Sequence, residues 1–183
     1  MDLLKAVNTV LPYMGEHPVA RIEGAKHPTV ELALASINRH KEMLLAEKWW
    51  FNRTEITLPV NTDGQIDVPT KTLNVYGLDC SVVIDGDKFF NLETGSRYFD
   101  KPIRVELALD WEFQRLPIYA AYHVMYLSCV EVYLADFGRE NTIPELQAMA
   151  EKQLVLLKEQ HLREMKFNAT KNSKHKIWRV RFR

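Results

Sequence analysis

The chain has 183 residues, a length that fits one domain. With 46% hydrophobic and 10% aromatic residues it can build a core, which excludes global disorder. The 24 basic and 24 acidic residues balance, which argues against a dedicated nucleic-acid binder, for which a strongly basic domain is expected.

The N-terminal quarter predicts two helices. Apolar residues at steps of three and four predict a helix over residues 2–14, ended by Gly15. A second helix is expected over residues 28–49, with Thr29 as its N-cap or in its first turn after Pro28. The first residues include Asp2 and precede no long apolar run, so we expect no signal peptide.

The pattern then changes to short alternating segments, which predict a β insertion over residues 54–109. Residues 55–60 alternate like a strand, Asn61–Gly64 is a turn signal, and residues 65–68 would be the returning strand. Further strands are expected over residues 73–76, 81–84, 88–91 and 103–109. The sequence therefore predicts a small antiparallel sheet, arranged as a meander.

Helical periodicity returns at residue 117. One helix is expected over residues 117–137, and a second over residues 142–167 with Thr142 as its N-cap and Glu145 three residues later. This order predicts an α+β fold, a four-helix bundle-like core from which the strands protrude. We expect residues 1–168 to form this single domain.

The helix over residues 118–137 is apolar enough to be mistaken for a membrane span. It also contains His123, Glu131 and Asp136, which are costly in hydrocarbon. We therefore expect no membrane insertion and a helix that protein covers nearly all round.

Residues 169–183 form an extended basic C-terminal tail. They hold six Lys and Arg and no Asp or Glu, which leaves 18 basic against 24 acidic residues in the rest of the chain. The last residues alternate, so a strand would place Trp178, Val180 and Phe182 on one side and arginines on the other. A solvated tail, contact with nucleic acid and docking on a partner protein all remain open, and the alternation favours docking.

Motifs for chemistry are absent. The sequence has no GxGxxG, P-loop, HExxH, GxSxG or EF-hand pattern. The six histidines lack ligand spacing, and Cys80 and Cys129 form no CxxC pair. We therefore predict no catalytic residue, no cofactor and no metal site, and hence no enzyme.

Three smaller patterns allow a functional and a structural interpretation. Asp85 and Asp87 around Gly86 could bind a cation, but they favour a hairpin turn. Trp49-Trp50-Phe51 could stack a sugar or a base, but such a cluster more often plugs the end of a helical bundle. Asp110 and Glu112 around Trp111 could form a glycosidase pair, but they also suit a solvated loop.

The sequence resembles tail tubular protein A, the head-to-tail adaptor or gatekeeper ring protein of short-tailed phages (podoviruses). The resemblance is best over residues 6–52, and Leu116-Pro117 opening the third helix extends it. It differs from the family at Trp49, where a glycine is more usual, and in its strongly basic C-terminus. The motifs, in order, are Ala6-Val7-Asn8, Gly15-Glu16, Pro18-Val19, Glu23-Gly24, Ile37-Asn38-Arg39 and Trp50-Phe51-Asn52.

The resemblance implies a virion structural protein without catalysis, assembled in the host cytoplasm. It implies a homo-oligomer of twelve copies, a dodecameric ring beneath the portal protein that continues the channel for genomic double-stranded DNA. A tail nozzle (tail tubular protein B-like) would attach below, with a tail fibre near that junction. An apolar helix over residues 117–137 would suit the two side interfaces of a ring subunit.

Three sets of contact residues follow as hypotheses. Docking to the portal or another partner is expected from the tail. The subunit interface is expected at Tyr119, Tyr122, Tyr126 and Tyr133, and the nozzle or fibre contact at Asp63, Gly64, Asp85 and Asp87. The tail set comprises Lys171, Lys174, Lys176, Trp178, Arg179, Val180, Arg181, Phe182 and Arg183.

Two other functions are weighed against the adaptor. A nucleic-acid-binding accessory protein using the basic C-terminal tail would bind duplex DNA with steep salt dependence, lost on truncation. A carbohydrate-active enzyme would lose its activity on Glu112→Gln without a change in assembly.

Overall fold

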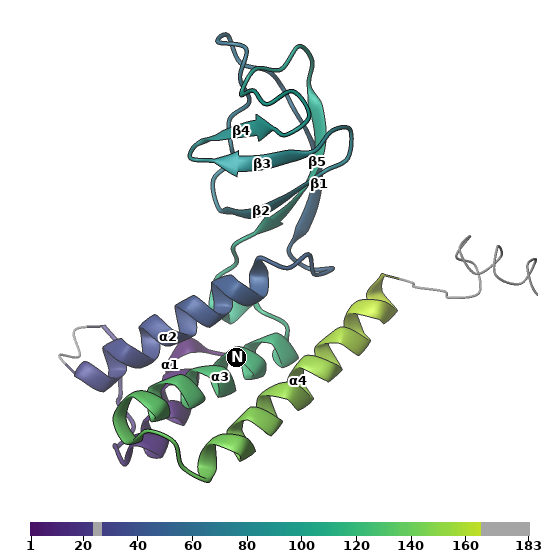
Figure 1. Ribbon diagram of the computed structural model, residues 1–183. Helices are drawn as coiled ribbons and strands as arrows, with labels where there is room; N and C mark the ends of the chain where they lie inside the picture. The colour runs from purple at the N-terminus through teal and green to yellow at the C-terminus, as the bar shows by residue number, and fades with distance from the viewer. Residues whose placement is uncertain (24–26, 166–183) are drawn as a thin grey trace, which may run out of the picture.

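Helices and strands occupy opposite ends of the molecule in the computed structural model, which describes residues 1–23 and 27–165 (Figure 1). The helices form the lower part of that view, and the strands rise from them as one protruding β region. The α+β class predicted from the sequence is confirmed, and the strands do come from a single insertion between the second and third long helices.

The N-terminal helices are shorter than the sequence predicts. Helix α1 spans Leu3–Val10 and continues as the 3-10 helix η1 over Leu11–Met14, which Gly15 ends at a φ of 72°. Helix α2 spans Pro28–Leu45, four residues short of the predicted end. His27 is its N-cap, so Thr29 lies in the first turn, one of its two predicted positions.

Helix α3, Ile118–Phe137, is the centre of the helical part. It contacts α1, α2 and α4, and half of its 20 residues are buried. By length and composition α3 could cross a membrane, but 56% of its most apolar window is buried by protein, as in the core helix of a soluble domain. The rest of the protein covers α3 less completely than predicted, because Ile118, Leu134 and Phe137 near its ends are exposed.

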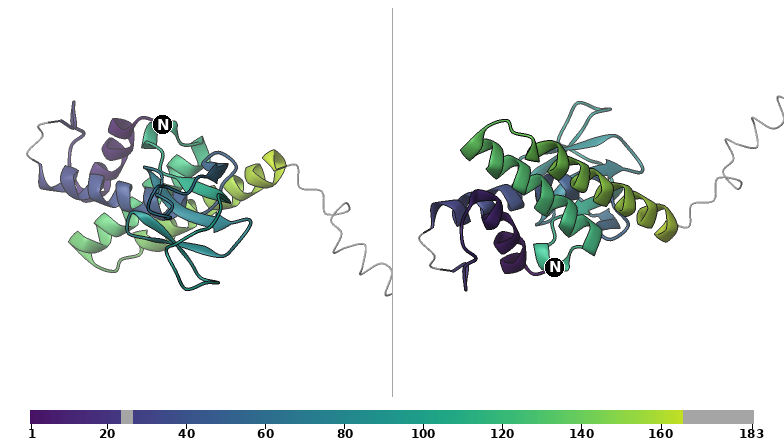
Figure 2. Two further views of the ribbon diagram at one scale, coloured as in Figure 1. Left: turned by 90° about the horizontal axis from the view of Figure 1, so that it is seen from above. Right: turned by 90° about the horizontal axis from the view of Figure 1, so that it is seen from below.

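Helix α4, Thr142–Glu164, runs back alongside α3, and the two lie side by side in Figures 1 and 2. The buried His123 of α3 donates from Nδ1 to the carbonyl oxygen of Ala150 at 2.8 Å and fastens the pair. The predicted N-cap is wrong: Asn141 occupies that position and makes no side-chain cap bond, while Thr142 is already helical.

The strands form two small antiparallel sheets rather than a meander. One sheet has the order β1-β5-β2, and the other is the β3-β4 hairpin. The predicted return strand over residues 65–68 is absent as a strand, since it forms a single bridge between Asp67 and Lys88. The strands are β1 Arg53–Leu58, β2 Thr72–Gly77, β3 Val82–Asp85, β4 Lys88–Asn91 and β5 Ile103–Leu109.

Pairing in the larger sheet joins distant parts of the chain. Arg53 lies opposite Ala108, and the register continues to Leu58 opposite Ile103. The sheet and the hairpin enclose a hydrophobic core of their own, separate from the helical clusters. Its buried members are Leu58, Ile66, Val82, Phe89, Phe99, Ile103, Val105 and Leu107. The β region is therefore a packed unit rather than a flexible loop.

Candidate assembly surfaces

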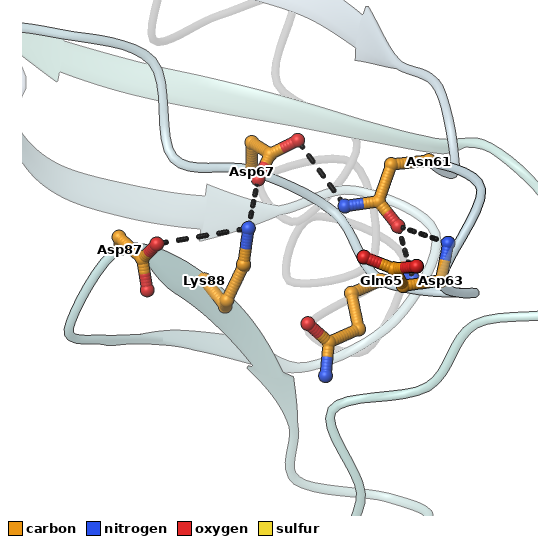
Figure 3. Close-up of polar contacts among 6 residues, drawn as sticks. All are labelled: Asn61, Asp63, Gln65, Asp67, Asp87 and Lys88. Atoms are coloured by element: carbon orange, nitrogen blue, oxygen red, sulfur yellow. Dashed lines mark hydrogen bonds and ion pairs between the residues drawn. The ribbon is translucent and has the colours of Figure 1, made fainter.

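The turn at Asn61 and the β3-β4 hairpin share a connected polar network (Figure 3). The Asn61 side-chain oxygen accepts from the backbone N–H groups of Asp63 and Gln65 at 3.0 and 2.9 Å, which fixes the predicted turn. The Asn61 amide nitrogen donates to Asp67 at 3.3 Å, and Asp67 forms an ion pair with Lys88. Lys88 in turn lies 3.6 Å from Asp87.

Charge pairing favours the ionised forms of Asp67 and Lys88. The hydrogen bond from Lys88 is the main reason that the pKa of the Asp67 carboxyl lies below its usual value. The same bond raises the pKa of Lys88. Each of the two groups thus stabilises the charged form of the other.

The predicted nozzle or fibre residues fall in two settings. Asp63 and Asp87 belong to the network, and Gly64 adopts a φ of 76° in the turn, a conformation that side chains disfavour. Asp85 is instead held 2.6 Å from Arg97. The hairpin-turn interpretation of residues 85–87 is confirmed by the β3-β4 pairing. The sequence placed Asn61 in a turn but did not indicate Asp67 and Lys88, since nothing local shows that these two side chains meet.

The tyrosines predicted at a subunit interface all lie on α3. Tyr122 and Tyr126 stack with ring centroids 6.3 Å apart, and both are half-buried, as is Tyr119. Tyr133 is buried, and its hydroxyl donates to Glu140. The first three therefore keep surface that a neighbour could cover, while most of Tyr133 is already used within the chain.

Helix α4 exposes several apolar side chains, among them Val155, which the helical periodicity predicts at the edge of the inner stripe. Val155 and Leu162 are 55% and 49% exposed, and a spacing of seven residues puts them on one face. Met43 of α2 is also exposed, and it borders a cavity of about 190 Å³ with Leu127 and Leu154. Exposed apolar groups of this kind mark a surface suited to protein contact.

A polar cluster fastens α2 to α3. Ser36 donates to Glu131 at 2.7 Å, and Arg39 and His40 are also paired with that carboxylate, His40 at 2.9 Å. Partial burial by itself raises the pKa of Glu131, but the hydrogen bond from Ser36 and the charge of Arg39 outweigh it and hold the pKa below its usual value. Four groups that the sequence scatters over 95 positions thus act as a structural tie.

The junction between the two ends of the molecule is built around Asn52, which is 1% exposed. Its amide nitrogen donates to the carbonyl oxygens of Leu45 and Leu109 at 2.6 and 3.1 Å, and its oxygen accepts from the N–H of Trp49 at 3.1 Å. One side chain thus joins the end of α2 to the end of β5. The junction holds the β region in a fixed position on the helices.

The aromatic run at this junction has the structural role that the sequence favoured. Trp49 is buried, and the backbone N–H of Trp50 donates to Nδ1 of His161 on α4 at 3.2 Å. Phe51 packs near Trp111, with ring centroids 5.6 Å apart. These side chains close the end of the helical part, so they are not an open stacking platform.

The residues suggested for catalysis also serve the structure. Lys41, which is buried, lies 2.9 Å from Asp110. Glu112 is exposed and accepts from Gln114 at 3.2 Å. Within residues 1–23 and 27–165, no group of three or more His, Cys, Asp or Glu is placed to hold a metal ion. The tail residues Lys171 to Arg183 lie outside the described residues.

Comparison with known proteins agrees with the sequence resemblance and extends it. Residues 4–167 match the family described as tail tubular protein. The chain is also 31% identical, over 185 residues, to "Tail tubular protein A" of Klebsiella phage KP34. That alignment covers 100% of this chain and 99% of the relative, so the similarity includes both the helical part and the β region.

Proposed function

The chain belongs to the tail tubular protein family and is a structural component of a phage tail, and we propose that it is the head-to-tail adaptor subunit. Twelve copies would form a ring between the portal and the tail nozzle, with the helices of each copy acting as one bundle-like body. The ring would continue the DNA channel and support tail-fibre attachment, and it would assemble in the host cytoplasm.

The observation that carries this proposal is the full-length relationship to a tail tubular protein A in a molecule with two separately packed ends. An adaptor must contact neighbours sideways and other components along the tail axis. Helix α4 with exposed Val155 and Leu162 offers side contacts in the helical part, and the charged turns of the β region offer a second surface at the other part of the fold. A ring subunit needs heterologous faces of this kind.

The charge distribution supports a channel role. Residues 1–168 carry six more acidic than basic residues, which suits a wall along which DNA must slide. A cationic wall would retain the DNA by electrostatic attraction. The tail holds six basic and no acidic residues, and we propose that it docks on another protein chain of the virion.

The first experiment measures the native mass of the purified protein, with negative-stain images of the same sample. We expect rings of about twelve copies, either alone or on added portal, following the closed symmetry of homo-oligomers. A protein that stays monomeric with and without portal would refute the proposal.

A matched pair of variants tests the side contact. Val155→Glu with Leu162→Glu should prevent ring formation and leave the circular dichroism spectrum unchanged, because it places two charges where apolar groups would be covered. Asn38→Glu adds a charge at an exposed position on α2 and should leave the ring intact. If the double variant still forms rings, α4 is not the side contact.

Duplex DNA binding separates the competing function from the adaptor. An accessory DNA binder should bind with a steep salt slope that disappears when residues 169–183 are removed. The adaptor, whose tail docks on protein, predicts no comparable affinity for the full-length chain either.

A further inference from the structure

We propose that the outer edge of β1 receives residues 177–183 of a neighbouring copy as an added antiparallel strand. The inference rests on the proposed function, because it requires copies assembled side by side. It assigns the tail a receptor within the assembly, in place of the portal expected from the sequence.

The edge of β1 is available for pairing. Among the residues that the structure describes, β1 pairs only with β5. The N–H of Leu109 donates to the carbonyl of Asn52 at 2.8 Å, which fixes the alternation along β1. Because antiparallel pairs alternate, the N–H and C=O groups of Arg53, Glu55 and Thr57 point away from β5. Such an edge is a template for another strand.

The two faces of β1 differ in character. Ile56 lies opposite Val105, which is fully buried, so its side chain is on the face of the β core. Ile56 is nevertheless 39% exposed, which leaves the side of that core open. Glu55 projects from the other face, and it has no ion pair within residues 1–23 and 27–165.

The tail has the complementary pattern. An antiparallel register with Val180 opposite Ile56 places Arg181 opposite Glu55. Trp178 and Phe182 would then lie on the same face as Val180 and extend the β core, while the arginines would share the face of Glu55. A shift of the pairing by one residue would put the arginines on the face of the β core and the apolar side chains on the face of Glu55, so the alternation specifies the register.

The length of chain before the segment favours a neighbouring copy. Helix α4 ends at Glu164, one turn after His161, which is bonded to Trp50 just before β1. The chain's own β1 therefore begins close to the end of α4. Residues 165–176 can reach roughly 40 Å when extended, which is far more than that short step requires. This reach fits a crossing to the next copy.

Disulfide trapping between two separately made chains tests the pairing. One chain carries Ile56→Cys and the other Val180→Cys, both with Cys80→Ser, and the full-length chains are mixed, oxidised and separated without reductant. In the proposed register this pair is not hydrogen-bonded, with Cα atoms about 4.5 Å apart, within the range of a disulfide. We expect a covalent dimer from the mixture.

The matched control replaces Ile56→Cys by Thr57→Cys, whose side chain lies on the opposite face, and should give little dimer. No dimer from the Ile56→Cys mixture, or equal yields from both mixtures, would overturn the proposal. A doubly substituted chain that forms only an internal disulfide would place the segment on its own β1 and overturn it as well.

A second variant tests the edge without cysteines. Glu55→Pro removes an N–H that β5 does not use, so the sheet should survive while strand addition is blocked. We expect Glu55→Pro to weaken ring assembly as much as removal of residues 177–183 does, and Glu55→Ala to leave it intact. Rings unaffected by Glu55→Pro and by the truncation would overturn this inference and leave the adaptor function standing.

Native mass measurements distinguish a failure of the adaptor proposal from a failure of the strand-addition inference. Monomers under every condition, portal included, would remove the adaptor proposal and this inference together. Portal binding lost on truncation, with no dimer trapped between copies, would assign the segment to the portal and overturn only this inference.

Discussion

Replacing Asn52 with alanine should loosen the attachment of the β region to the helices. The change removes three buried hydrogen bonds at once and leaves the carbonyls of Leu45 and Leu109 and the N–H of Trp49 without their partner. The carbonyl of Leu45 is among the last of α2, where no intrahelical donor remains.

The size of the effect follows from the cost of these bonds. A hydrogen bond within a folded protein contributes about 1 kcal/mol net, and a buried group left unpaired costs about 1–3 kcal/mol. Since the three groups share one site their costs are not additive, and we expect a loss of about 3 kcal/mol in the free energy of unfolding for Asn52→Ala.

Urea denaturation followed by tryptophan fluorescence measures this loss, because Trp49 and Trp50 adjoin the site. Asn38→Ala, at an exposed position on α2, is the control and should change stability by less than about 0.5 kcal/mol. A loss below about 1 kcal/mol for Asn52→Ala would show that water replaces the amide and that the junction does not depend on it.

Three further predictions concern titration, thiol reactivity and a buried ion pair. Burial lowers the pKa of His161, so the folded state favours its neutral form. Stability should therefore fall as the pH drops below about 6.5, and His161→Asn, which can still accept the hydrogen bond, should reduce that dependence in urea titrations at several pH values, while His40 and His123, whose pKa values burial also lowers, keep part of it. Burial raises the pKa of the Cys129 thiol to about 12, so mass spectrometry after iodoacetamide treatment at pH 8 should find label on half-exposed Cys80 and none on Cys129 until the protein unfolds. Lys41→Met should cost about 2 kcal/mol by leaving the Asp110 carboxylate unpaired, and adding Asp110→Asn should restore most of it; equal losses in the single and double variants would contradict the ion pair.

Local patterns in the sequence located most of the regular elements. The 3.6-residue period gave the four long helical segments, and the Asp85-Gly86-Asp87 turn gave the hairpin. The helix ends were less predictable because distant groups decide them. Helix α2 ends at Leu45, before its predicted end, where the Asn52 amide and the Trp49 indole bind the carbonyls of Leu45 and Leu44.

Strand order was not predictable from local alternation. A meander pairs neighbours along the chain, whereas β1 pairs with β5 across about fifty residues. Which strand edges pair depends on packing around Phe89 and Val105. The alternation of side chains along a strand does not indicate which other strand pairs with it. The same reason explains why Asp67 and Lys88 were missed as an ion pair.

The sequence by itself determined the α+β class, the family resemblance over residues 6–52 and the absence of recognisable catalytic motifs. These depend on residue types at short spacing, which the chain displays directly. Only the tertiary structure decided that Asn52 joins the two ends of the molecule, that the turn at Asn61 meets the β3-β4 hairpin, and that β1 keeps an open edge. Each of these arises from groups brought together by long-range packing, and that packing depends on the whole core rather than on any one segment.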